Sequence, residues 1–369
     1  DTIKDLGKQS FYWCRRLKTV KLPASLEKLG ENAFFYCDSL EKLEIPDRVE
    51  KLESGAVSDC KSLKSLKLPA NLKMIAPSAF YDCSSLKNVA IPKSVESVGY
   101  SAFSYCTALE SIEFPDSIKT TYNEYGNIES YGLYDAIFYG CSSLKNVKLP
   151  KDLGIITESM FEGCTSLKTI ELPSGITKIE EKAFKDCSSL SKIKLLNKVT
   201  EIGSNAFKDC TQMVSVYAPN SVQKIGENAF TGCSLLTIYG TENSYAQTYA
   251  RENGILFSTG EMPDSEFTEE AAGEWTILTD GSNAIITAYT GADIALTIPK
   301  IINGRKVIAC KKDLLKDKRD MITSVTIEAE LTSLPDGFFS NFSQLETVSL
   351  PDTIKDLGKQ SFYWCRRLK

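Results

Sequence analysis

The residues of this chain best suited to chemistry are its twelve cysteines, because a thiol can form a disulfide, hold a metal ion or act as a nucleophile. The chain contains no histidine, which excludes Ser-His-Asp and Cys-His catalysis and every metal site that needs a histidine ligand. No Cys-x-x-Cys pair, glycine-rich phosphate loop or nucleophile elbow occurs. We therefore expect a protein that is not an enzyme and that needs no cofactor and no metal.

The spacing of the cysteines indicates a structural repeat. Ten of them form a series at Cys14, Cys37, Cys60, Cys83, Cys106, Cys141, Cys164, Cys187, Cys210 and Cys233. Every step is 23 residues except the step of 35 between Cys106 and Cys141, so one 12-residue insertion interrupts the array. One thiol per repeat at a fixed position is typical of a buried packing residue rather than of a disulfide framework.

Phenylalanine precedes cysteine by three residues in most repeats, usually with alanine before it. This column includes Phe34, Phe80, Phe103, Phe184, Phe207 and Phe230, and Val57 is a substitute within it. A proline nine residues after the cysteine keeps the same period. We expect the cysteine and phenylalanine columns to form structural ladders in a continuous core.

The elements that must position these columns are short. A 23-residue unit cannot bury its own apolar face, so the units must stack as a repeat solenoid. Residues 62–69 alternate apolar and polar side chains before Pro69, which predicts a short strand, and stacked copies give a parallel sheet. A second, shorter extended segment follows, and residues 205–210 predict a helical or 3-10 turn.

This unit resembles the BspA-like leucine-rich repeat of bacterial surface proteins, over residues 1–236 and again over about 322–369. The resemblance implies a right-handed coil with a parallel β-sheet. It also implies adhesion to host matrix proteins, cells or glycans by a secreted or surface-displayed protein. A structural spacer or scaffold that presents another module is the alternative.

The order of the segments differs from that family. Residues 237–257 look like its C-terminal cap, 258–273 predict a flexible acidic linker, and 274–321 look like its strand-rich N-terminal cap. Repeats then resume over 322–369. Residues 352–369 are identical to residues 1–18, which gives a super-period of 351 residues.

Three explanations of this super-period stay open: a tandem protein cut inside two copies of one domain, a permutation, and a numbering artefact. A complete capped solenoid would need residues 261–351 ahead of residues 1–260. We therefore expect domain exchange or head-to-tail assembly through the repeat ends.

The composition narrows the class of partner. Forty-three basic and 48 acidic side chains give a net charge of −5, which provides no positive field for nucleic acid. The apolar runs are far shorter than the roughly 20 residues of a membrane span. We expect a secreted or cell-surface protein whose signal and anchor are not in this segment, with a surface protein or glycan as its partner.

The insertion, over about residues 119–134, is the most individual feature of the sequence. Its tyrosines, Tyr122, Tyr125, Tyr131 and Tyr134, together with asparagine and glycine, have the composition of a recognition loop. We take them as the candidate binding residues. The alternative is a loop folded back over the core. The exposed strand positions alternate lysine and glutamate, which favours a solvated face over a charge-reading site.

Overall fold

The computed structural model describes residues 2–122, 128–130, 132–263, 267–311, 313–331, 333–354 and 356–369. The chain divides into two compact units. The first contains the residues up to Gln212 together with Ser221–Cys233, and the second contains Met213–Asn220 and Ser234–Lys369.

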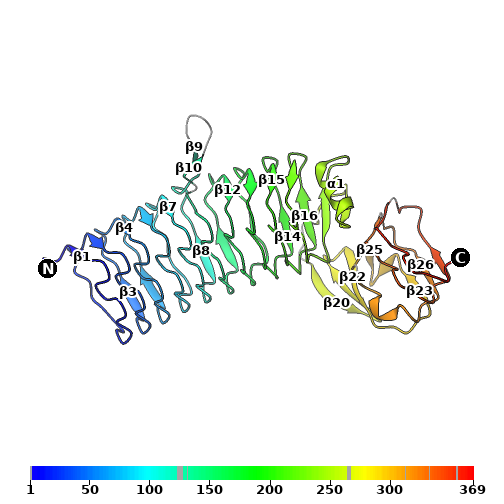
Figure 1. The fold of residues 1–369 in the computed structure, drawn as a ribbon, viewed down its shortest axis with the longest axis horizontal. Helices are drawn as coiled ribbons and strands as arrows, with labels where there is room; N and C mark the ends of the chain where they lie inside the picture. Colours follow the sequence, from blue (N-terminus) through cyan, green and yellow to red (C-terminus); the bar gives the residue numbers. More distant parts are fainter. Residues whose placement is uncertain are drawn as a thin grey trace. The chain divides into compact units, whose positions relative to one another are not determined.

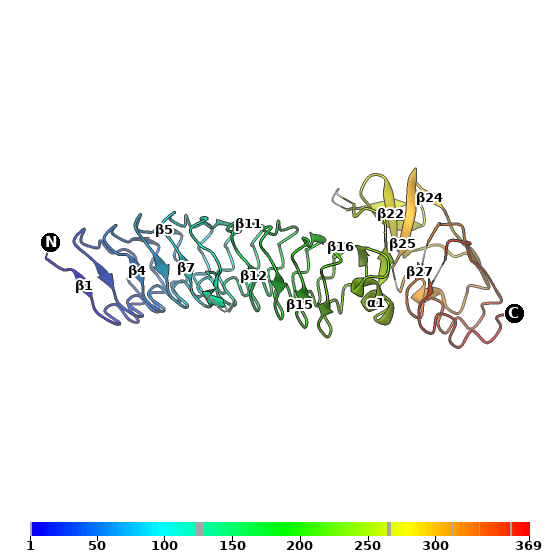
Figure 2. The ribbon, with the colours of Figure 1, turned by 90° about the horizontal axis from the view of Figure 1, so that it is seen from above.

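The first unit is the predicted parallel solenoid (Figure 1). One side is a ladder of two-residue strands in the order β1 (Asp5–Leu6), β2 (Lys28–Leu29), β4 (Lys51–Leu52), β6 (Met74–Ile75) and β7 (Ser97–Val98). Beyond the insertion the same side continues as β12 (Ile155–Ile156), β13 (Lys178–Ile179), β15 (Glu201–Ile202) and β17 (Lys224–Ile225). Figure 2 shows these strands as successive rungs.

The other strand of each turn forms the second side. Here β3 (Lys42–Glu44) pairs in parallel with β5 (Ser65–Lys67), and β8 (Ser111–Glu113) pairs with β11 (Asn146–Lys148). The strand β14 (Lys192–Lys194) belongs to the same side. Ser111 lies opposite Asn146, so the ladder holds its register across the 35-residue step.

The phenylalanine column forms the centre of this unit. Phe184 and Phe207 stack with ring centroids 5.3 Å apart and planes 2° apart, and Phe230 continues the stack at 5.2 Å. These rings are buried, as are the cysteines from Cys37 to Cys233. The rings stack because they occupy the same position in successive turns, which explains why the sequence repeats phenylalanine at this position.

The segments before each cysteine are hydrogen-bonded turns. Lys208 N–H donates to the carbonyl of Asn205, which is the expected 3-10 type of bond. However, Asn205 and Asp209 have φ angles of 56° and 60°, in the left-handed region. Because of these angles, alternate N–H groups point toward the next turn of the array. The Phe207 N–H, for example, donates to the carbonyl of Ala229 in the next turn. Hydrogen bonds therefore join each turn to the next, and the turns do not continue as helices.

The second unit begins with three parallel strands, β16 (Ser215–Ala218), β18 (Thr237–Gly240) and β19 (Leu256–Ser258). The helix α1 (Tyr245–Glu252) lies between β18 and β19 in the sequence, and the Ser244 hydroxyl caps it by accepting from Gln247 N–H.

A five-stranded sheet follows. Its order is β20 (Thr268–Ala272), β21 (Trp275–Thr279), β22 (Asn283–Tyr289), β25 (Arg305–Cys310) and β24 (Ile301–Ile302). The strand β23 (Ala295–Ile298) of the cap-like segment begins a parallel sheet that continues through β26 (Ser324–Ile327) and β28 (Thr347–Ser349). On the other side of these repeats, β27 (Ser333–Leu334) pairs with β29 (Asp356–Leu357). One 3-10 turn, η1 (Lys316–Lys318), lies among them.

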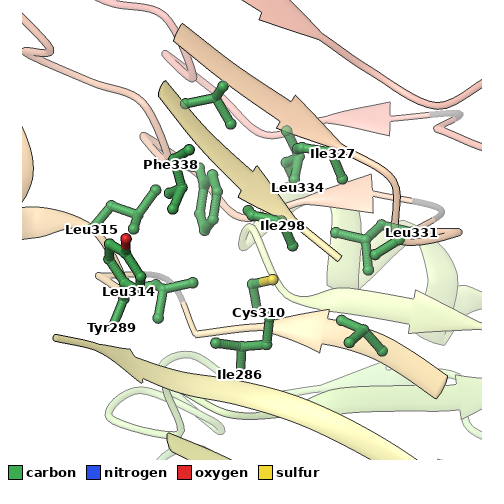
Figure 3. Close-up of a cluster of buried hydrophobic side chains, with 14 of the residues drawn as sticks. Ile286, Tyr289, Ile298, Cys310, Leu314, Leu315, Ile327, Leu331, Leu334 and Phe338 are labelled. Carbon is green, nitrogen blue, oxygen red and sulfur yellow. The ribbon is translucent and has the colours of Figure 1, made fainter. Parts of the chain in front are cut away.

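One strand of this sheet lies within the segment that the sequence predicted to be a flexible linker. Residues 258–273 were expected to form a flexible linker, but β20 lies within them and pairs antiparallel with β21 over five residues. Glu269 and Glu270, two of the acidic residues of this segment, lie on an edge strand. Glu270 also forms an ion pair with Arg305 at 2.9 Å. The other face of the sheet helps to close the core in Figure 3, where Ile286 and Cys310 meet Ile298 and Leu334.

The two identical 18-residue segments take the same place in a turn but contact neighbours on opposite sides. In the first copy, Phe11 stacks on Phe34 of the turn that follows, at 4.9 Å. In the second copy, Phe362 stacks on Phe339 of the turn that precedes it, at 5.4 Å.

Candidate functional site

The insertion forms a two-stranded stem on the first unit. Strand β9 (Thr121–Tyr122) pairs antiparallel with β10 (Ile128–Ser130), and Figure 1 shows this stem projecting from the side of the ladder that carries β7 and β12. Residues 123–127 and 131 lie outside the described residues.

The base of the stem is fixed to the solenoid by hydrogen bonds. Gly154 N–H donates to the Thr120 hydroxyl at 3.0 Å, and the Thr157 hydroxyl donates to the carbonyl of Tyr134 at 3.1 Å. Leu133 is fully buried and bridges to Val98, so the ladder resumes directly after the insertion. The stem therefore starts and ends on a rigid scaffold.

The structure places the four candidate tyrosines unequally. Tyr122 lies in β9, while Tyr125 and Tyr131 fall outside the described residues. Tyr134 is half-buried, and its N–H donates to the carbonyl of Val98 at 3.1 Å. Tyr134 thus belongs to the anchored base of the insertion, two residues beyond Gly132.

A second group of tyrosines was not selected from the sequence. Tyr81, Tyr105 and Tyr139 pack edge to face across three successive turns, with centroids 5.4 Å and 5.3 Å apart. We call these three residues the tyrosine ridge. Tyr105 is 38% exposed and lies over Gly140, where a Cβ would stand 2.9 Å from its ring. The available signal was a column of aromatic residues one or two positions before the cysteine.

Burial shifts the pKa of two residues of this ridge. It raises the pKa of Tyr81 and that of Tyr105, and negative charge on Asp59 and Asp82 adds to the effect at Tyr81. Burial also raises the pKa of Asp59. The phenols of Tyr81 and Tyr105 therefore remain hydrogen-bond donors at neutral pH, on rings that can pack against a ligand.

The strand face carries charges that are already paired. Glu110 lies 3.9 Å from Lys87 and 3.7 Å from Lys145, and Lys148 contacts Glu113 directly. These side chains are largely exposed, so each pair stabilises the fold only slightly. A shallow groove of about 860 Å³ crosses β8 and β11, and its walls carry three lysines and two glutamates.

The thiol ladder has a structural geometry. In the cysteine column, each buried thiol from Cys37 to Cys233 donates to the carbonyl of the phenylalanine-column residue one turn earlier, as from Cys187 to Phe161 at 3.1 Å and from Cys210 to Phe184 at 3.1 Å. Burial raises the pKa of the Cys106 thiol to about 12 and places that of Cys164 well above its ordinary value. All twelve thiols are free, and buried thiols of this kind are poor nucleophiles and poor metal ligands.

Within the described part of the chain, no group of three or more cysteine or acidic side chains is placed to hold a metal ion. Among the helices that the structure describes, none has the length and apolar character to cross a bilayer.

Comparison with known proteins identifies the repeat. The model of the BspA-type leucine-rich repeat region matches residues 4–125, 132–253 and 311–369. No functionally curated protein matches the chain.

Solved structures of bacterial proteins are also similar. A leucine-rich repeat protein from Bacteroides ovatus is 19% identical, with 93% of this chain and 81% of that chain covered at a TM-score of 0.52. This likeness supports the solenoid fold. A leucine-rich cell surface protein from Faecalibacterium prausnitzii is 28% identical, with coverages of 70% and 74% and a TM-score of 0.44.

Proposed function

The chain belongs to the BspA-type leucine-rich repeat family, and from that premise we propose that it is a non-catalytic binding protein of the bacterial surface or of the secreted fraction. Its role is adhesion to host matrix proteins, cells or glycans. The repeats supply a stiff array, on which the binding residues are presented.

The observation that carries this proposal is the anchored insertion beside exposed tyrosines. The insertion lies in the sequence between Tyr105 and Tyr139 of the tyrosine ridge, and Tyr100, which is 54% exposed, follows Val98, the bridge partner of Leu133, by two residues. Rigid rings with hydrogen-bonding tips lose little conformational freedom when they bind. Tyr122, Tyr125, Tyr131 and Tyr134 remain the proposed binding residues, joined by Tyr105.

The alternative role is a spacer that presents another module. The observation that favours it is the paired charge of the strand face, which leaves that face with little to attract a partner. A spacer needs a regular, stiff array but no ligand of its own.

The experiment that separates these roles is a binding screen of the full chain against immobilised matrix proteins and glycans. Residues 121–132 are deleted in one variant, which restores the 23-residue spacing and keeps Thr120 and Leu133. In a second variant, Tyr105 and Tyr139 are changed to serine. The exposed Tyr245 on α1 is changed to serine as the matched control.

Saturable binding that is lost in the deletion variant, and kept in Tyr245→Ser, supports adhesion through the insertion. Binding that is weakened by the double substitution adds the tyrosine ridge to the site. Absence of saturable binding by the unaltered chain would overturn the adhesive role in favour of the spacer.

A further inference from the structure

An exposed patch of aromatic and basic side chains lies in the turn around Cys14. Tyr12 and Trp13 are both exposed, and Arg15 and Arg16 follow them in the sequence. The identical segment of the second unit carries the same four side chains in another turn. We call each group of four a Trp–Arg patch; the first is Tyr12, Trp13, Arg15 and Arg16, and the second is Tyr363, Trp364, Arg366 and Arg367.

The patch stays exposed beside a neighbouring turn on either side. In the first unit, the turn that follows packs Tyr36 against Trp13 with ring centroids 5.3 Å apart, and Trp13 is still 50% exposed. In the second unit, Asn341 N–H of the preceding turn donates to the carbonyl of Tyr363 at 2.8 Å, and Trp364 is 52% exposed. The solvent-facing position of the indole is therefore a property of the turn itself.

Stacking of the repeats does not require these residue types. Two residues after the cysteine, where Arg16 stands, most other turns have a serine, at Ser39, Ser62, Ser85, Ser143, Ser166 and Ser189. One residue before the cysteine, where Trp13 stands, the other turns of the cysteine series have tyrosine, aspartate or glycine. Core packing thus explains the cysteine and phenylalanine columns, but not the tryptophan and arginines beside them.

In both patches an arginine lies over the indole ring. The guanidinium carbon of Arg15 is 4.0 Å from the ring centroid of Trp13, and that of Arg366 is 4.2 Å from the ring centroid of Trp364. The attraction between the cation and the ring holds the guanidinium in place. Its planar edge carries N–H donors in a fork that fits a carboxylate, so less conformational freedom is lost when a carboxylate binds.

Each patch keeps positive charge, although the whole chain has a net charge of −5. Residues 6–26 contain five basic side chains and no acidic one. The next turn pairs Glu31 with Lys8 at 2.9 Å and Asp38 with Arg15 at 3.5 Å. The other three arginines of the two patches form no ion pair with the residues that the structure describes. This local charge suits a short anionic partner better than a long polyanion, which needs an extended basic surface.

We propose that each Trp–Arg patch binds an acidic segment of a partner protein, with a carboxylate on the guanidinium groups and an apolar side chain against the exposed rings. Tryptophan, tyrosine and arginine are the residue types that most often dominate the binding energy of protein interfaces. A protein segment supplies carboxylates and apolar side chains together. Neither the insertion nor the tyrosine ridge takes part, so this binding is independent of adhesion through the insertion.

The test is calorimetric titration of the full chain, at low ionic strength, with the peptide acetyl-Glu-Glu-Tyr-Glu-Glu-amide. A heparin oligosaccharide provides a parallel titration with an anionic glycan. Both arginines of the first patch are changed to glutamine in one variant, both arginines of the second patch in another, and all four in a combined variant. Lys64→Gln with Lys168→Gln is the matched control, because it removes two exposed charges from the strand face.

We expect the peptide to saturate the unaltered chain and each two-arginine variant to bind about half as much peptide per chain. The affinity should be at least about tenfold lower in the combined variant and unchanged in the lysine control. Deletion of residues 121–132 should leave peptide binding intact, which separates this result from the adhesive role of the insertion.

Three results would overturn the proposal. The first is the absence of saturable peptide binding by the unaltered chain. The second is equal affinity in the combined variant and the unaltered chain, or an equal loss in the lysine control. The third is tighter binding of the heparin oligosaccharide than of the peptide, lost in the combined variant, which would assign the patches to an anionic glycan.

Discussion

Single side chains in the stacked columns control the stability of each turn. Phe184 is fully buried and stacks on rings in the turns before and after it, at 5.1 Å and 5.3 Å. We expect Phe184→Ala to lower the free energy of unfolding by about 3–5 kcal/mol through lost burial and a cavity. Urea unfolding measures this loss, and Phe35→Ala at a half-buried position is the control. An unchanged midpoint in Phe184→Ala would show that the column is not a core.

A second prediction for single residues concerns the buried thiols and the pH dependence of stability. A thiol that stays neutral in the folded chain contributes stability that is complete below its unfolded pKa of about 8.5 and is lost as the pH rises through the folded value. For Cys106 the folded value is about 12.

Substitution tests this linkage. Between about pH 8 and about pH 10, the decrease in unfolding free energy should be about 2 kcal/mol smaller in Cys106→Ala than in the unaltered chain. Urea midpoints at the two pH values measure the difference, with Cys14→Ala at an exposed position as the control. Identical pH profiles for the Cys106→Ala variant and the unaltered chain would contradict the buried, neutral thiol.

At the scale of elements, the insertion is separable from the array that carries it. Leu133 resumes the ladder beside Val98, and Gly154 is bonded to Thr120, so both ends of the deleted segment are already in register. We expect deletion of residues 121–132 to change the free energy of unfolding by no more than about 1 kcal/mol. Circular dichroism and thermal melting provide the measurement, and a collapse of the melting temperature would show that the insertion is part of the core.

The elements could be predicted from the sequence wherever stacking forces one residue type into every turn. The 23-residue period, the parallel strands and the repeat family are confirmed for this reason. The strand β20 was missed because its Thr-Glu-Glu-Ala-Ala sequence has low strand propensity and gains its order by pairing with β21.

The candidate site was less predictable. Tyr81, Tyr105 and Tyr139 occupy variable positions of the repeat, so that only the fold shows their contact across turns. The apolar cluster of Val214 and Leu235 with Leu278, Ile285 and Ala309 depends on a sheet that follows the first two residues in the sequence, and no local pattern encodes such packing.

For the whole molecule, the identical end segments support a proposal of exchange between copies. Phe11 of the first segment stacks on Phe34, and Phe362 of the second stacks on Phe339; from these matching ring contacts we propose that the two identical segments exchange between copies of the chain. We expect a concentration-dependent dimer or longer assembly in light scattering coupled to size exclusion. A monodisperse monomer at every concentration would refute the exchange.

The central claim is that the chain binds a partner through the tyrosines of its insertion. The most direct measurement is the equilibrium affinity of the full chain and of the variant without residues 121–132 for the same immobilised matrix protein or glycan. We expect saturable binding by the full chain and an affinity at least about tenfold lower in the variant. Equal affinities would contradict the claim by placing the site elsewhere on the array, and no saturable binding by either protein would leave the molecule as a spacer.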